Sequence, residues 1–216
     1  YKTFLWLYVA TQYSPSNCSK ELNIYAYLTD HKKTIAERNL EPLDRIHANT
    51  AFTTSCKPST DIVIFRSEEW FKVLIHETFH NLGLDFSALD IQDANRRILE
   101  MFSIPQRIEL YESYSETWAA IIHTMFVSFL TTRNKEDGDR ILKKVEDALK
   151  TEILFSVFQC TKILHHYQLS YYDLIQTHCP LAKEARKRYN EKTNILAYYV
   201  IKTVLLFHVN DFVTWC

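Results

Sequence analysis

The chain has 216 residues, of which 47% are hydrophobic and 14% are aromatic; this composition excludes an intrinsically disordered segment and is enough to bury a substantial core. The formal net charge of -1, with lysines and arginines dispersed along the chain, excludes the basic stripe of a nucleic-acid-binding protein. The most apolar stretch, residues 195–213, is interrupted by Lys202, His208, Asn210 and Asp211, so we expect a buried helix there and no membrane contact.

The first 66 residues are predicted to be rich in strands. Residues 1–11 are apolar and aromatic, residues 22–28 (LNIYAYL) are rich in β-formers, and residues 46–54 (IHANTAFTT) are a further short candidate. The clearest strand is residues 61–66 (DIVIFR), a β-branched run that follows turn residues. These segments predict a small mixed or antiparallel sheet.

From residue 67 onwards the apolar residues repeat with a period near 3.6, which predicts helices. The first helix is expected over residues 68–82, with Ser67 as its N-cap and Gly83 as its left-handed terminator. A long helix is expected to begin just after Pro105 and to end near Thr132. The other helices are expected over residues 87–101, 139–158, 160–168, 171–176, 181–190 and 194–208.

These elements predict an α+β fold in which a small N-terminal sheet is followed by a mainly helical body. No clean linker divides the chain, so we expect a single domain over residues 1–216, with a strand-rich part (1–66) and a helical part (67–216) that carries the functional site.

The cysteines are five in number, widely spaced, and without a C-x-x-C pair. An odd number at wide spacing is typical of a reduced intracellular protein rather than of a disulfide scaffold. We therefore expect free thiols, and an intracellular or virion location rather than a secreted one. The five are Cys18, Cys56, Cys160, Cys179 and Cys216.

The stretch IHETFHNLGLDF (residues 75–86) carries two histidines four residues apart. On a helix, His76 and His80 lie on one face, one turn apart, where two neutral nitrogens can share a Zn²⁺ ion. Glu77 lies about 100° round the helix, where it can contact a water on the metal and act as a general base. This is the H-E-x-x-H arrangement. The alternative is two core or surface histidines that bind no ion.

A catalytic zinc ion also needs a third protein ligand. Glu109, Glu112 and Glu116 form one stripe on the long helix, and His123 shares that stripe. Buried carboxylates so close together repel one another unless a cation neutralises them. The alternative is a solvated acidic stripe.

A second candidate for the third ligand follows the first helix. A metzincin would carry a third histidine at position 86, where this chain has Phe86. Asp85 is one residue out of that register, so it is an alternative ligand or an ordinary turn carboxylate.

At these residues the chain resembles the gluzincin class of zinc metallopeptidases, in which a second helix supplies a glutamate ligand to the H-E-x-x-H motif. SETWA (residues 115–119) is similar to the N-E-x-F-A-like setting of the aminopeptidase branch, which implies that Glu116 is the ligand. The thermolysin-like branch instead implies Glu112 as the ligand and Glu116 as a partner that orients a histidine. The 35 residues between His80 and Glu116 exceed the usual spacing, so the helix at 87–101 would be an insertion.

Two further resemblances concern substrate and origin. Residues 49–52 (NTAF) are similar to the edge strand of thermolysin-like enzymes, which implies that Asn49 and Ala51 pair with a peptide substrate. The stretches IVIFRSEEWFKVLIHETFHNLGLDFS, YSETWA and NILAYYVIK resemble uncharacterised H-E-x-x-H proteins of large DNA viruses, which implies virion partners.

The expected function is that of a zinc metallopeptidase with a zincin-like fold. Zinc would be held by His76, His80 and Glu116, and Glu77 would accept a proton from the attacking water. A tyrosine or histidine would stabilise the oxyanion; Tyr199 is the choice, with Tyr198, His165, His166 and His178 left open. The alternative function is a structural or virion-associated protein with a vestigial or purely structural zinc site.

Overall fold

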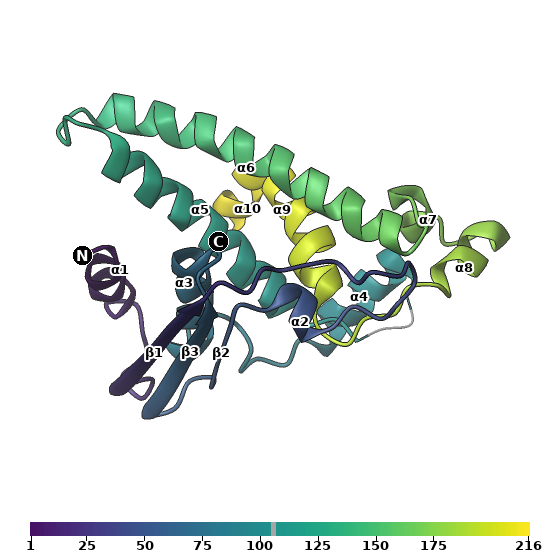
Figure 1. Ribbon diagram of the computed structural model, residues 1–216, viewed down its shortest axis with the longest axis horizontal. Coiled ribbons are helices and arrows are strands. Elements are labelled where there is room, and N and C mark those ends of the chain that lie inside the picture. Colours follow the sequence, from purple (N-terminus) through teal and green to yellow (C-terminus); the bar gives the residue numbers. More distant parts are fainter. Residues whose placement is uncertain (105–106) are drawn as a thin grey trace. The chain divides into compact units, whose positions relative to one another are not determined.

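The computed structural model describes residues 1–104 and 107–216 (Figure 1). It has the α+β fold that the sequence predicts, with a small N-terminal sheet and a mainly helical remainder. The described chain forms two compact units. The first unit comprises residues 1–32, 50–88 and 114–152, and the second comprises the other described residues. The single domain expected from the sequence stays a prediction.

The sheet of the first unit has three strands in the order β1-β3-β2. Strand β1 (Glu21–Thr29) runs parallel to β3 (Ser59–Arg66), and β2 (Ala51–Thr53) runs antiparallel to β3. The sheet is therefore mixed, and the strands expected at 22–28 and 61–66 are confirmed. Alternate residues of β3, beginning with Thr60, are buried, so one face of this central strand meets the core.

Helix α3 (Trp70–Asn81) packs against the sheet and forms the centre of the first unit (Figure 1). Every residue from Phe71 to Asn81 is buried, which explains why its apolar residues are not confined to one stripe. Gly83 follows with φ +64°, as expected of a terminator. The expected N-cap is wrong: the helix begins after Glu69, which has φ 56°, and Ser67 does not cap it.

Residues 1–11 are not a strand. They form helix α1 (Lys2–Ala10), which buries Trp6 and Ala10. The indole Nε1 of Trp6 donates a hydrogen bond of 2.7 Å to Oγ1 of Thr78 on α3. A contact between residues so distant in sequence outweighs the β preference of the aromatic side chains.

The strand expected at 46–54 is also wrong in its first half. Asp44 accepts a hydrogen bond from the backbone of Ile46 and closes a capping box with His47, so the chain begins the short helix α2 (Arg45–Ala48) instead. Only the second half forms a strand, β2.

Helices expected further along the chain are present with shifted bounds. Those expected at 139–158 and 160–168 are one helix, and the one expected at 194–208 begins with a π-helical segment, η1. Pro105, the expected neighbour of the long helix, lies outside the described residues. The helices are α4 (Gln92–Phe102), α5 (Leu110–Thr131), α6 (Gly138–His166), α7 (Tyr171–Ile175), α8 (Pro180–Arg186), η1 (Leu196–Ile201), α9 (Lys202–Phe207) and α10 (Val209–Trp215).

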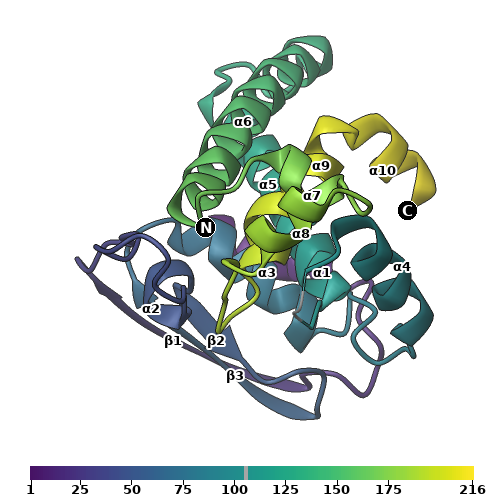
Figure 2. The same cartoon turned by 90° about the vertical axis from the view of Figure 1, so that its right-hand side faces the viewer.

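The helix expected at 194–208 ends with α9 at Phe207, close to the expected end, and α10, which was not expected, follows it. The chain bends by 92° between the segment Leu196–Phe207 and α10 (Figure 2). No single helix among the described residues is long and apolar enough to cross a membrane, although this bent pair passes that test by length and composition.

Cys18 and Cys56 form a disulfide in the first unit. The expectation of free thiols is therefore wrong for these two residues and right for the other three, Cys160, Cys179 and Cys216. The two bonded cysteines are 38 residues apart, and they meet because the loops before β1 and before β3 lie at the same end of two parallel strands.

Candidate metal centre

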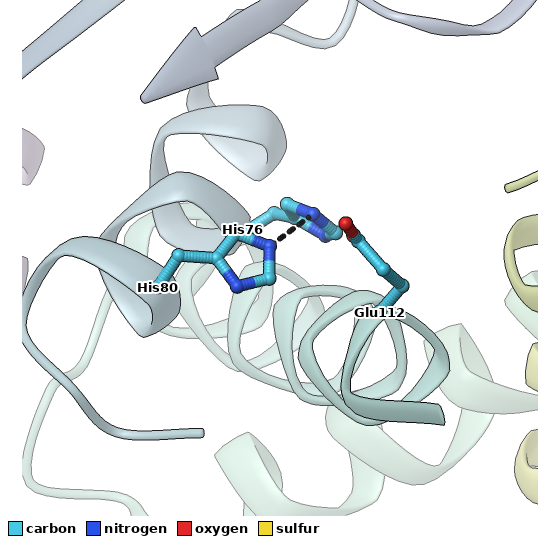
Figure 3. A group of neighbouring side chains, drawn as sticks. All are labelled: His76, His80 and Glu112. Carbon is cyan, nitrogen blue, oxygen red and sulfur yellow. Dashed lines mark hydrogen bonds between the residues drawn. The ribbon is translucent and has the colours of Figure 1, made fainter. Parts of the chain in front are cut away.

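Helix α3 presents the two histidines of the H-E-x-x-H stretch on one face. His76 and His80 are both buried, and their Nε2 atoms lie 3.0 Å apart (Figure 3). The spacing of four residues produces this arrangement, as the sequence predicts.

Glu112, on the first turn of α5, completes a group that could hold a metal ion. One ligand atom from each of His76, His80 and Glu112 lies within 4.8 Å of the other two. Figure 3 shows the Glu112 carboxylate directed toward the imidazoles. Two ring nitrogens and a carboxylate oxygen are a donor set that divalent transition metals accept.

The Nδ1 atoms of both histidines face other carboxylates. Nδ1 of His76 lies 3.0 Å from Oε2 of Glu116, and Nδ1 of His80 lies 2.5 Å from Oδ2 of Asp85. Carboxylates in this position fix the ring orientation of metal-binding histidines. Glu116 and Asp85, which are candidate ligands from the sequence, thus contact the opposite side of each ring from the Nε2 pair.

A carboxylate beside Nδ1 favours the tautomer in which this nitrogen carries the proton. A neutral imidazole that donates its Nδ1–H to a carboxylate has a lone pair on Nε2. Two such lone pairs only 3.0 Å apart repel each other unless a proton or a metal cation lies between them. The arrangement of His76 and His80 is therefore suited to a cation.

Lys72, one turn before His76 on α3, is a site residue that the sequence patterns did not indicate. Its Nζ lies 2.6 Å from Oε1 of Glu116 and 3.9 Å from Oε1 of Glu69. Burial alone would lower the pKa of Lys72, but these two carboxylates raise it above the ordinary value, so the ammonium is charged. Glu116 therefore bridges a buried cation and a candidate metal ligand.

Asp85 has its own supporting contacts. Burial acts to raise the pKa of this carboxyl group, but hydrogen bonds from His80 and Ser87 outweigh it and hold the pKa below its ordinary value. The backbone N–H and the hydroxyl of Ser87 both donate to Oδ1. Asp85 is thus an ionised carboxylate fixed against His80.

Within the second unit, both oxygens of Glu112 accept hydrogen bonds. Asn194 Nδ2 donates to Oε1 at 3.1 Å, and the Tyr198 hydroxyl donates to Oε2 at 3.1 Å. Tyr198 belongs to the π-helical segment η1, and such segments are frequent at functional sites. Asn194 was not anticipated, and a polar residue just before a strongly apolar helix is the signal that could have indicated it.

The other candidates lie as follows. Glu77 is buried on α3, 7% exposed. The Tyr199 side chain packs against the core of the second unit. His123 lies beside the ring of Phe71, with centroids 6.1 Å apart, and burial lowers its pKa. Glu109 precedes α5 and pairs with Arg107 at 2.8 Å.

The residues expected to bind a peptide backbone are on separate elements. Ala51 opens β2, a strand at one edge of the sheet, and pairs with Ile64 of β3. Asn49 belongs to the second unit, where its Oδ1 accepts a hydrogen bond of 3.1 Å from Thr193.

Fold and site together define a mixed α+β protein with a candidate metal centre of two histidines and a glutamate. The chain is 24% identical over 201 residues to an uncharacterised protein, R210, of Acanthamoeba polyphaga mimivirus. The match covers 88% of this chain and 50% of the mimivirus protein, so the chain spans about half the length of this curated relative. The similarity supports a viral origin. No family model and no solved structure matches the chain, and membership of the gluzincin class stays a prediction.

Proposed function

We propose that this chain is a zinc-dependent metallopeptidase whose ion is held by His76, His80 and Glu112. The observation that carries the proposal is the group of two histidine nitrogens and one carboxylate oxygen that all lie within 4.8 Å of one another. Two histidines and a glutamate are the ligands of one common class of catalytic zinc site, which leaves the fourth position to water. Two nitrogens bound to one tetrahedral zinc are about 3.3 Å apart, and the observed 3.0 Å is close to this value.

Glu112 is a better candidate for the third ligand than Glu116. Glu112 belongs to the group of possible ligand atoms that includes the two histidines, whereas Glu116 contacts the Lys72 ammonium and Nδ1 of His76. This favours the thermolysin-like assignment over the aminopeptidase-like one, because Glu116 then orients His76 while Glu112, one turn earlier, contacts the ion.

Zinc bound at this site supplies Lewis acidity and lowers the pKa of a bound water toward neutrality. Glu77 accepts a proton from the attacking water and delivers it to the amine that leaves. His76 and His80 keep their orientation through Glu116 and Asp85.

Tyr198 replaces Tyr199 as the expected hydroxyl donor at the site. Its hydroxyl already contacts Glu112, whereas the Tyr199 side chain packs in the core of the second unit. A phenol beside a metal ligand can donate to the oxyanion that forms at the substrate carbonyl. The substrate is a peptide or protein segment, which could add to the sheet beside β2, the strand at one of its edges.

Glu77→Gln tests the proposal. The variant is expected to keep stoichiometric zinc, measured by inductively coupled plasma mass spectrometry, and to lose hydrolysis of an unstructured protein such as casein. His76→Ala is the matched variant that should lose both the metal and the activity. A wild-type chain that binds no metal, or that binds zinc and cleaves no peptide, would contradict the proposal and favour a structural or virion-associated protein with a vestigial site.

A further inference from the structure

The last turn of α3 is held by two loops that are far apart in sequence. A helix ends with carbonyl groups that have no partner within the helix, and here the final three accept hydrogen bonds from the loop between α1 and β1 or from the loop between β2 and β3. The pairs are Cys56 N to His80 O at 3.1 Å, Ser19 Oγ to Asn81 O at 2.8 Å, and Ser14 Oγ to Leu82 O at 2.9 Å.

The Cys18–Cys56 disulfide joins these two loops and lies directly against Gly83. A Cβ atom at position 83 would lie 2.8 Å from Sγ of Cys18 and 3.4 Å from Cβ of Cys56. Glycine is therefore required at position 83 for two reasons: the backbone there has a positive φ, and the disulfide leaves no room for a Cβ atom.

Gly83 belongs to the turn between a candidate metal ligand and the carboxylate that orients it. His80 lies three residues before Gly83 and Asp85 lies two residues after it, and their side chains meet at 2.5 Å. The position of Asp85 thus depends on the conformation of the turn, and the disulfide packs on that turn.

We propose that the Cys18–Cys56 disulfide is a redox-sensitive restraint on the turn at residues 80–85. Its reduction increases the mobility of this turn and weakens metal binding by His76 and His80. The inference rests on the metal site proposed above. It concerns the regulation of that site, because loss of the contacts that orient a ligand lowers metal affinity by about 10- to 100-fold.

The reductant is a dithiol. Cys56 is partly exposed and Cys18 is buried, so the thiolate of the dithiol attacks Sγ of Cys56, the S–S bond breaks, and Cys18 leaves as a thiolate that takes up a proton. The second thiol of the reductant then attacks the mixed disulfide and releases Cys56. The protein gains two thiols and the dithiol becomes a cyclic disulfide, which balances the two electrons.

The test compares the oxidised and the reduced form of the 216-residue chain, in a background in which Cys160, Cys179 and Cys216 are replaced by alanine. The protein is reduced with dithiothreitol, which is then removed by gel filtration under nitrogen, because dithiols bind zinc. Zinc affinity is measured by competition with a chromophoric chelator, and amide hydrogen exchange is measured over residues 80–85. The double variant Cys18→Ser/Cys56→Ser mimics the reduced state without thiols that could bind the metal.

Reduction and the double variant are both expected to weaken zinc binding by about tenfold or more and to speed exchange over residues 80–85. Ser14→Ala is the control, because it removes one carbonyl contact and keeps the disulfide, and it should change both quantities less. Equal affinity and equal exchange in the oxidised and reduced protein would overturn the inference. If the oxidised protein binds no zinc, the proposed function fails, and the exchange measurement still decides whether the disulfide holds the turn.

Discussion

Lys72 and Glu116 form a largely buried ion pair, with Nζ of Lys72 2.6 Å from Oε1 of Glu116 and with 10% and 14% of the two side chains exposed. The other oxygen of Glu116 lies 3.0 Å from Nδ1 of His76. Through this carboxylate the lysine acts on the candidate metal ligand without touching it.

We predict that Lys72→Met destabilises the protein, because it leaves the Glu116 carboxylate buried without its cation. Breaking a buried pair by removing one partner costs about 3–5 kcal/mol, which urea unfolding followed by circular dichroism would measure. The double variant Lys72→Met/Glu116→Gln should recover most of this loss, since no buried charge remains. If Lys72→Met alone were as stable as the wild type, the ion pair would make no net contribution to the free energy of unfolding.

The third ligand can be identified by comparing Glu112→Gln with Glu116→Gln. If Glu112 binds the ion directly, its amide variant should lose more zinc affinity than the Glu116 variant, whose loss should be about 10- to 100-fold because only the orientation of His76 suffers. Competition with a chelator measures both values. The reverse order would make Glu116 the ligand, as the resemblance to the aminopeptidase branch implies.

Tyr198→Phe is predicted to reduce kcat by about 10²- to 10³-fold, the usual effect of removing one oxyanion donor, with zinc content unchanged. Tyr199→Phe is the matched control on the neighbouring residue and should leave kcat near the wild-type value, because its side chain packs in the core. Equal effects of the two substitutions would mean that the hydroxyl contact to Glu112 has no part in the reaction.

Stability is predicted to fall as the pH rises toward neutrality because of Glu191. Burial raises the pKa of this carboxyl group from 4.5 to about 7, although hydrogen bonds from Tyr189 and from the backbone of Leu196 oppose the shift. A raised folded-state pKa means that the folded protein binds more protons than the unfolded chain between these values. The contribution is complete below pH 4.5 and is lost as the pH passes through about 7.

Urea unfolding at several pH values between 4 and 8 would measure this effect. Glu191→Gln removes the titrating group and keeps an acceptor for the Tyr189 hydroxyl, so the variant should show a flatter dependence over this range. An identical slope in both proteins would assign the pH dependence to other groups.

Gly83→Ala is predicted to hinder formation of the Cys18–Cys56 disulfide, because the added methyl group would lie 2.8 Å from Sγ of Cys18. Titration of free thiols in the unfolded, unreduced protein should show more than the three of the wild type. Gly138→Ala is the matched control: nothing lies within 4 Å of a Cβ there, so its thiol count should stay unchanged.

Local patterns predicted much of the fold, and long-range contacts explain most of the failures. The strands β1 and β3 and the helix α3 follow from residue type and periodicity over a few neighbours. Helix α1 depends on the contact of Trp6 with Thr78, which no local pattern contains. The pairing of Cys18 with Cys56 depends in the same way on the parallel strands that follow them.

In the candidate site, too, local patterns predicted some residues and long-range contacts determine the others. The spacing of His76 and His80 identifies one face of one helix, and it predicted the pair. Glu112 and Glu116 are one turn apart on a second helix, so helical periodicity does not indicate which of them is the metal ligand. What distinguishes them is Lys72, on α3 outside the motif, together with Asn194 and Tyr198 near the C-terminus. Only the folded chain brings these residues to the two carboxylates.

The order of segments in the two units has a consequence for synthesis on the ribosome. Each unit is built from three separate stretches of chain, and the first is complete only when residue 152 has been made. The two histidines therefore leave the exit tunnel before α5, the helix that carries Glu112 and Glu116. A nascent chain that paused at this point would expose both imidazoles. They could then bind a metal ion before the rest of the site has been synthesised.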